Sequence, residues 1–353
     1  MKKGFTLIEL LAVIVILAII ALIATPIVLN IISDTKESAD LRSVEFYMDA
    51  VEQAIMKAQL NGKQIGGTYN ILEDGSLCLI DSECTGANKI IVEVKGDVPK
   101  SGSIDIENGN IGNILIELNN KKMTTNDKGQ VIPHPCTLVE DADNNNTITP
   151  GDKYECKVDP EKSAYTFYVL SDGENGTTNL IMDRNMCDDG TPTSPEKEEK
   201  CLVAWNLSGS NSDGPVTAMD YLNNATSTWS NVENLNITYN DEKEHFNDFL
   251  ITGKARLPRY DEVTVDGKCA DSYGSCQLYL VNYLSSNSNV TGEGLQNISE
   301  IKGYWTLSSG GVRSSGGVRY DYAWYVGYYG YVNTINIDYD DYNGVRPVIN
   351  LKL

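Results

Sequence analysis

An almost unbroken apolar run near the N-terminus is the feature that most constrains this chain. The sequence opens Met1-Lys2-Lys3-Gly4 and is apolar from Leu10 to Leu29, with only Thr25 and Pro26 interrupting. Twenty residues of helix reach about 30 Å, which is enough to cross a bilayer. The two lysines ahead of the run favour a cytoplasmic position for that end. We therefore expect a transmembrane segment within residues 5–32.

A carboxylate lies one turn into this run. Glu9 would cost on the order of 2.5 to 3.5 kcal/mol inside a bilayer, so it needs a partner or a role. The stretch Gly4-Phe5-Thr6-Leu7-Ile8-Glu9 resembles the class III signal of type IV pilins and pseudopilins. The resemblance implies cleavage after Gly4 by prepilin peptidase, N-methylation of Phe5, and pairing of Glu9 with the Phe5 amine of a neighbouring subunit. The alternative is a plain signal anchor with Glu9 at the membrane interface.

The helix is expected to continue beyond the apolar run. Val44, Met48, Val51 and Ile55 recur at three- to four-residue steps against a polar face, the pattern of a helix that packs on a sheet. Gly62 is the expected stop, and Pro26 should kink the helix. The expected segments are therefore a leader at 1–4 and a helix at 5–62, which would extend roughly 84 Å over residues 5–60.

A small sheet domain is predicted at 63–132. Residues 63–87 look rich in loops, and three strands follow them, with Gly102, Asn108-Gly109 and Asn119-Asn120 as turn signals. The expected strands are Ile90–Val94, Ser103–Ile106 and Ile114–Leu118. The predicted fold class is α+β: a long helix on a small antiparallel sheet, which the resemblance also implies, followed by a second α+β domain.

The cysteines and the net charge indicate an exported protein. The eight cysteines fall into four close couples without the CxxC spacing of zinc or redox sites, and this favours local disulfides. The couples are Cys78 with Cys84, Cys136 with Cys156, Cys187 with Cys201 and Cys269 with Cys276. The formal net charge of −21 argues against a nucleic-acid partner, which needs clustered lysine and arginine.

The disulfide-closed segment 133–158 contains a candidate calcium loop. Counting Asp141 as position 1 places side-chain or main-chain oxygens where a twelve-residue EF-hand loop has them. The candidate ligands are Asp141, Asp143, Asn145, the carbonyl of Thr147, Thr149 and Asp152. Asn146 replaces the usual glycine, and Asp152 replaces the bidentate glutamate, as in dockerin-type loops. Without flanking helices we expect a calcium-clamped hairpin; the alternative is an Asn/Asp-rich turn closed by its disulfide.

Residues 159–353 have short strands and tryptophan-containing loops. Four segments occur in the order of the C-type-lectin-like fold, in its formylglycine-generating-enzyme branch, and together they resemble it: Ala255–Glu262, Gly303–Ser308, Ala323–Val326 and Gly344–Ile349. The resemblance implies pairing of the first and last strands of the domain. The enzyme family uses a cysteine pair near its C-terminus, and no cysteine follows Cys276, so we do not expect its activity. His134 and His245 lie in no catalytic motif and are expected to be solvated.

The last part of the chain has the composition of a binding surface. Eight tyrosines lie between Tyr320 and Asn343, and tyrosine with Asn, Asp, Ser and Gly is typical of paratopes. The candidate ligand-binding residues are Tyr320, Tyr322, Tyr325, Tyr328, Tyr329, Tyr331, Asn333, Asn336, Asp338, Tyr339, Asp340, Asp341 and Tyr342. The segment also resembles the variable region of diversity-generating retroelement targets; the alternatives are a ligand-binding surface without diversification, or ordinary surface strands.

These features favour a non-enzymatic pilus subunit or pilin-like adhesin. It would pass through the membrane as a precursor, polymerise with other pilin subunits, and bind a surface protein or glycan through its distal domain. One alternative is a pseudopilin of a type II secretion or DNA-uptake machine. The other is a surface enzyme held by a pilin-like anchor.

Overall fold

The fold was determined as a computed structural model, which describes residues 7–94, 98–173, 176–193, 201–241, 245–246, 248–281, 303–315, 317–327 and 329–353. The chain divides into two compact units, unit 1 (Met1–Thr124) and unit 2 (Thr125–Leu353). The candidate calcium loop therefore belongs to the same unit as the C-terminus. Each unit is described by itself.

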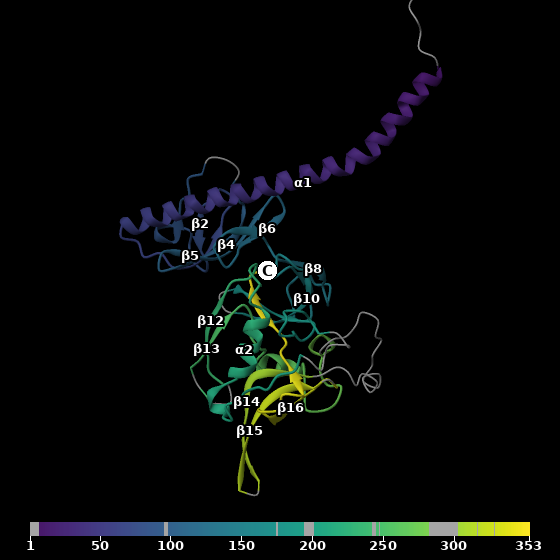
Figure 1. The fold of residues 1–353 in the computed structure, drawn as a ribbon. Coiled ribbons are helices and arrows are strands. Elements are labelled where there is room, and N and C mark those ends of the chain that lie inside the picture. Colours follow the sequence, from purple (N-terminus) through teal and green to yellow (C-terminus); the bar gives the residue numbers. More distant parts are fainter. Residues whose placement is uncertain are drawn as a thin grey trace, which may run out of the picture. The chain divides into compact units, whose positions relative to one another are not determined.

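One helix, α1 (Leu7–Leu60), forms the N-terminal part of unit 1. It continues through Pro26, and its ribbon bends within the N-terminal half (Figure 1). The amide of Gly62 donates to the carbonyl of Gln59 (2.9 Å) and that of Lys63 to the carbonyl of Ala58 (3.1 Å). Gly62 has a φ of +78°, so these bonds form the Schellman arrangement that ends helices at glycine. The predicted stop at Gly62 is confirmed.

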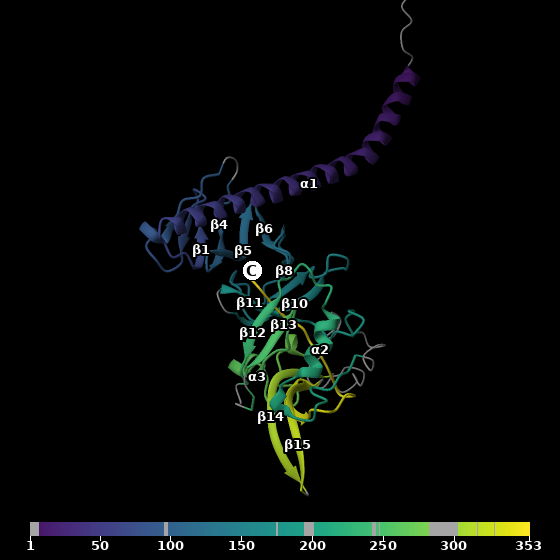
Figure 2. The same ribbon diagram turned by 60° about the vertical axis from the view of Figure 1, so that its left-hand side comes forward.

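The outer half of α1 packs on an antiparallel sheet in unit 1. Strands follow the order β3-β2-β1-β4-β5-β6, and α1 runs along one face of this sheet in Figures 1 and 2. Val44, Val51 and Ile55 are buried as expected, but Tyr47 takes the buried place predicted for Met48. The strands are β1 (Gly67–Ile71), β2 (Leu77–Leu79), β3 (Lys89–Ile90), β4 (Ser101–Glu107), β5 (Asn110–Leu118) and β6 (Lys121–Thr125), with a 3-10 turn, η1 (Gly86–Asn88).

Two of the three predicted turns of this sheet are confirmed, but Gly102, the third, lies inside β4 opposite Ile116, and two strand predictions are wrong. Asn108-Gly109 joins β4 to β5 and Asn119-Asn120 joins β5 to β6, with all four residues at positive φ, as two-residue hairpins require. The segment 63–87 is not mainly loop, because β1 and β2 lie in it. The strand expected at Ile90–Val94 ends at Ile90, because its neighbour β2 is only three residues long.

Unit 2 is built from two main sheets and a hairpin. One sheet has the order β18-β11-β10-β9-β8 and another the order β16-β15-β14-β17, while β12 pairs with β13. The elements along the chain are β7 (Val131–Pro133), β8 (Cys136–Glu140), β9 (Lys153–Cys156), β10 (Tyr165–Asp172), β11 (Thr178–Met182), η4 (Asn211–Asp213), α2 (Val216–Ala225), β12 (Leu235–Tyr239), β13 (Phe249–Gly253), α3 (Tyr260–Thr264), η5 (Val265–Gly267), η6 (Leu278–Leu280), β14 (Gly303–Ser315), β15 (Val318–Gly327), β16 (Tyr331–Asn336), β17 (Asn343–Gly344) and β18 (Val348–Leu351).

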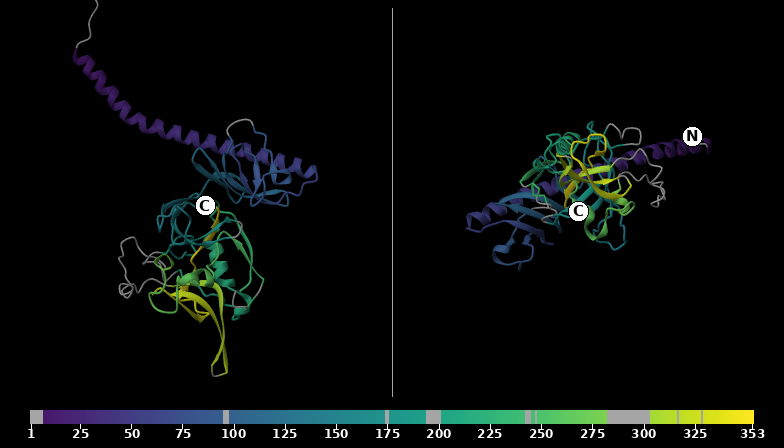
Figure 3. Two further views of the ribbon diagram at one scale, coloured as in Figure 1. Left: turned by 180° about the vertical axis from the view of Figure 1, so that it is seen from behind. Right: turned by 90° about the horizontal axis from the view of Figure 1, so that it is seen from below.

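The C-terminal strand completes the first sheet of unit 2. β18 pairs antiparallel with β11, placing Leu180 opposite Ile349, and β11 pairs with β10. The resemblance implies pairing of the first and last strands of residues 159–353; the last strand instead pairs with the second, β11, and the first, β10, lies on the other side of β11. Trp205, Trp229 and Trp305 are fully buried in the core. The hairpin of β14 and β15 extends from the body of unit 2 in the left view of Figure 3, as in Figure 1.

A buried ion pair joins α3 to the sheets. Glu262, 2% exposed, accepts hydrogen bonds from Arg256 Nη1 (2.8 Å) and from the main-chain amide of Arg259 (2.8 Å). Ser171 of β10 and Asn179 of β11 donate to the same carboxylate. Burial alone would raise the pKa of Glu262, but the arginines and these hydrogen bonds together lower it.

Removing this charge should destabilise unit 2. Glu262→Gln leaves Arg256 buried without a counter-ion, which we expect to cost about 3 kcal/mol. Because the pKa of Glu262 is depressed in the folded state, the stabilisation is present at neutral pH and is lost as the pH falls below the ordinary glutamate range. Thermal unfolding at pH 7 measures the loss. The control is Asp261→Asn, an exposed neighbour whose change should leave stability within about 0.5 kcal/mol; equal losses would contradict the role of Glu262.

Candidate functional site

The N-terminal processing residues are only partly described. Gly4 and Phe5 lie outside the described residues, and so does the side chain of Glu9, whose backbone is part of α1. Large apolar side chains cover the described surface of this half of α1. They are Leu11, Ile14, Val15, Ile16, Leu17, Ile19, Ile20, Leu22, Val28, Ile31 and Ile32, each at least 47% exposed. Within the described part of the chain, no helix reaches the combined length and apolar character needed to cross a membrane.

The candidate calcium loop connects two paired strands. β8 and β9 are antiparallel, and the Cys136–Cys156 disulfide joins directly opposed residues at their ends. The loop is therefore a hairpin connection without flanking helices, as predicted. Asn146 has a φ of +59°, so it adopts the left-handed conformation expected where an EF-hand has glycine.

The fold brings three of the predicted ligands together. Carboxylate oxygens of Asp141, Asp143 and Asp152 lie within 4.8 Å of one another. Asp152 is buried, and its oxygens accept the amides of Ala142 and Thr149, each at 2.8 Å. The amide of Asn146 donates to Asp141 Oδ2 (2.8 Å) and holds the pKa of that carboxyl below its ordinary value.

The other predicted ligands take part in local turns. Asn145 Oδ1 accepts from the amide and the hydroxyl of Thr147, both at 2.6 Å. The hydroxyl of Thr149 is 3.4 Å from Asp152 Oδ1. By contrast, Asp141 Oδ1 is buried without a hydrogen-bond partner among the described residues. A carboxylate oxygen in that situation suits a cation.

The thirteen residues predicted to bind a ligand differ in how far their side chains are exposed. Tyr325 and Tyr331 are 4% and 7% exposed, so the prediction that they offer contact surface is wrong for this fold. Tyr328 lies outside the described residues. The half-buried members are Tyr322, Tyr329, Asn336 and Tyr342, and the exposed ones are Tyr320, Asn333, Asp338, Tyr339, Asp340 and Asp341.

The buried tyrosines form the inner part of a larger aromatic group. The hydroxyls of Tyr325 and Tyr331 are 3.1 Å apart, and the ring of Tyr325 makes edge contacts with Trp305 and Tyr342. Burial, with hydrogen bonding to Tyr331 and the nearby hydroxyl of Tyr342, raises the pKa of Tyr325 far above its ordinary value. These phenols therefore stay neutral and fix the positions of their neighbours.

A tyrosine from outside the predicted segment joins this group. Tyr273 lies in the loop closed by the Cys269–Cys276 disulfide, and its ring centroid is 4.7 Å from that of Tyr331 and 5.4 Å from that of Tyr329. We call Tyr273, Tyr325, Tyr329, Tyr331 and Tyr342 the tyrosine cluster. One local feature of the sequence could have indicated Tyr273. It is a tyrosine among Asp, Ser and Gly residues, inside a short loop closed by a disulfide.

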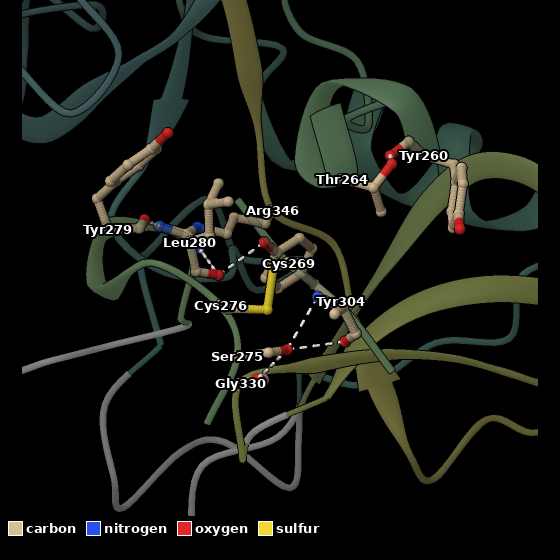
Figure 4. Close-up of a disulfide and its surroundings, with 11 residues drawn as sticks. Tyr260, Thr264, Cys269, Ser275, Cys276, Tyr279, Leu280, Tyr304, Gly330 and Arg346 are labelled. Atoms are coloured by element: carbon tan, nitrogen blue, oxygen red, sulfur yellow. Dashed lines mark hydrogen bonds between the residues drawn. A yellow bond between two sulfur atoms is a disulfide. The ribbon is translucent and has the colours of Figure 1, made fainter. Parts of the chain in front are cut away.

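The disulfide loop is tied to the chain beside it. Gly274 and Cys276 donate to the carbonyls of Tyr329 (2.8 Å) and Gly330 (3.0 Å), and Val332 donates to the carbonyl of Ala270 (2.8 Å). Figure 4 shows the disulfide with Ser275 and Gly330 beside it. The ring of Tyr273 thus projects from a backbone that is held at several points.

A buried arginine supports the residues that follow this loop. Arg346 is fully buried and donates to the main-chain carbonyls of Met182, Tyr279 and Leu280. Its guanidinium also lies 5.0 Å from the ring centre of Tyr304, a cation–π distance. Figure 4 shows Arg346 directed at Tyr279 and Leu280, with Tyr304 nearby.

His245 is exposed, as expected, whereas His134 is half-buried, and both have partners in the chain. His134 contacts the carbonyls of Cys136 (2.9 Å) and Lys352 (2.7 Å) through its two ring nitrogens. His245 Nδ1 lies 3.2 Å from a carboxylate oxygen of the buried Asp241, and no helix is assigned to its segment among the described residues. His134 therefore contacts the main chain next to the C-terminus. His245 forms a pair with Asp241, which the positions of the two residues in the sequence did not indicate.

Comparison with known proteins identifies the N-terminus only. Residues 1–25 match the prokaryotic N-terminal methylation motif, which is the class III signal of type IV pilins. No curated protein matches the chain, and no solved structure matches it. The lectin-like resemblance of the distal domain therefore stays a prediction. The matched motif implies processing by prepilin peptidase and association with other pilin subunits.

Proposed function

We propose that this chain is a type IV pilin-like subunit that assembles through α1 and binds a cell-surface partner through unit 2. The methylation motif at residues 1–25 carries the first part of this proposal. In this proposal Phe5 carries the processed, methylated amine and Glu9 is the acid that pairs with it in a neighbouring subunit. Export would begin at the cytoplasmic membrane and end in a filament or on the cell surface.

The exposed apolar side chains of α1 support assembly. Eleven large apolar residues between Leu11 and Ile32 are exposed in the single chain, and they occur on all sides of the helix. A helix that is apolar all round needs a cover of lipid or of other helices. A bilayer would cover these side chains before assembly, and neighbouring subunits would cover them afterwards.

Unit 2 supports the binding part of the proposal. A filament subunit needs only α1 and a small domain, whereas this chain carries four disulfides, three of them in unit 2. The exposed tyrosines and aspartates of the 320–342 segment suit contact with a surface protein or glycan. A lectin-like fold for residues 159–353, with no catalytic role, is part of this proposal. A pseudopilin remains the alternative within the pilin class.

Assembly should depend on Glu9. Glu9→Ala removes the partner of the Phe5 amine of the next subunit, and the unpaired buried charge should reduce incorporation into fibres about ten-fold or more. Fibres sheared from cells, probed with an antibody to this protein, give the measurement. Glu52→Gln, an exposed acid on the same helix, is the matched control and should assemble normally. Normal fibres with Glu9→Ala, or a mature chain that starts at Met1, would contradict the proposal.

We also propose that the hairpin loop at 141–152 binds calcium. The three converging carboxylates and the unpartnered Asp141 Oδ1 fit a hard cation with oxygen ligands. Asp141, Asp143 and Asp152 would hold the ion, joined by Asn145, the carbonyl of Thr147 and Thr149. Calcium would add a fixed positive charge and rigidity to this loop and has no catalytic part.

Calcium should raise the melting temperature of the purified protein. At a concentration one hundred times the dissociation constant, one bound ion adds about 2.7 kcal/mol of stability. Asp141→Asn and Asp143→Asn should abolish the shift, because each removes a charged ligand while keeping an oxygen in place. Glu140→Gln, an exposed acid next to the loop, should keep it. If calcium does not shift the melting temperature of the unmodified protein, or shifts that of all variants equally, the loop is an Asn/Asp-rich turn and not a calcium site.

A further inference from the structure

The exposed side of the tyrosine cluster combines two distant segments. Tyr273 contributes from the 269–276 loop, and Tyr342 continues the cluster into the exposed segment 338–341. Rings in contact connect the two, since Tyr331 touches both Tyr273 and Tyr325 and the latter touches Tyr342. Tyr273 and Tyr342 therefore flank the same pair of buried rings, Tyr331 and Tyr325, although they lie more than sixty positions apart in the chain.

Tyr273 is unusual in being rigid and exposed at once. Its side chain is 75% exposed, although its ring edge contacts Tyr329 and Tyr331 and its loop is closed by a disulfide. Core packing does not explain why this ring is exposed to water. A pre-positioned aromatic side chain loses little conformational entropy when a partner covers it, which is the property of a binding contact.

The charged residues within the two segments that form this surface all have one sign. Residues 269–281 and 329–345 contain no lysine or arginine. They contain four aspartates, all exposed: Asp271, Asp338, Asp340 and Asp341. The described arginines nearest in sequence are engaged elsewhere: Arg319 pairs with Asp321 (2.8 Å), Arg313 lies over the ring of Tyr322 (4.8 Å), and Arg346 is buried.

We propose that this surface, residues 270–275 together with 338–342, binds a basic segment of the partner protein, with Tyr273 as a direct contact. The inference rests on the proposed binding function and names the chemistry of its partner. An arginine side chain can lie against an exposed tyrosine ring and at the same time pair with a neighbouring carboxylate. Carboxylates can accept hydrogen bonds from sugar hydroxyls, but only a cationic partner also gains from their charge, so the observations favour a lysine- and arginine-rich peptide.

A labelled peptide tests this surface in the full-length mature protein in detergent. The probe is a fluorescein-labelled decapeptide of alternating arginine and serine, followed by fluorescence anisotropy at low salt, with the glutamate–serine counterpart as the opposite-charge probe. Tyr273→Ala should weaken binding about three-fold and Tyr273→Phe should bind as the unmodified protein does, because the ring is the contact. The triple change Asp338→Asn, Asp340→Asn and Asp341→Asn should weaken binding about ten-fold.

A charge-matched control separates this surface from general attraction to an acidic protein. Asp49→Asn, Glu52→Gln and Glu83→Gln neutralise three exposed acids of unit 1, and this triple variant should bind the probe within a factor of about two. Equal weakening by the two triple variants, or unchanged binding with Tyr273→Ala, would overturn the inference.

The proposed function has a separate readout. Sheared fibres should contain the unmodified protein and every surface variant in equal amounts. Fibres that lack the unmodified protein would refute the assembly function, whatever the peptide does. Fibres that contain all variants, combined with unchanged peptide affinity, would refute only the basic-partner inference.

Discussion

The packing of unit 2 depends on a buried cation that has no counter-ion among the described residues. Arg346 is fully buried, and its guanidinium is satisfied by the carbonyls of Met182, Tyr279 and Leu280 and by the face of Tyr304. A buried guanidinium is stable only when its N–H groups donate hydrogen bonds. Because those acceptors come from the end of β11 and from the segment after the Cys269–Cys276 disulfide, Arg346 connects the main sheet to the base of the loop that carries Tyr273. The rigidity of the exposed ring therefore has its origin in the core.

The tyrosines of unit 2 have two different roles that composition does not distinguish. Tyr325 and Tyr331 are buried and hydrogen-bonded to each other, whereas Tyr273 and Tyr339 are 75% and 48% exposed. The buried pair holds the cluster in place, and the exposed rings are available to a partner. A tyrosine-rich segment can thus be partly core even where its composition is that of a paratope. The buried pair lies in β15 and β16, whereas Tyr273 and Tyr339 lie outside these strands.

The sequence predicted local features well and long-range ones poorly. Gly62, the Asn108-Gly109 turn and the four disulfides involve residues close in the chain, so their geometry follows from local chemistry. The convergence of Asp141, Asp143 and Asp152 was also predictable, because one loop holds all three. Tyr273 was missed because its contact with Tyr331 depends on pairing between segments nearly sixty residues apart. His134 was missed for the same reason, since its second partner is the carbonyl of Lys352.

The N-terminal half of α1 and unit 2 have opposite surface chemistry. The N-terminal half of α1 exposes apolar side chains without described partners of its own, so its stability in water requires lipid or other subunits. Unit 2 exposes carboxylates and phenols that remain solvated without a partner. The hydrophobic effect would therefore drive assembly through α1, while the binding proposed for unit 2 would be reversible and sensitive to salt.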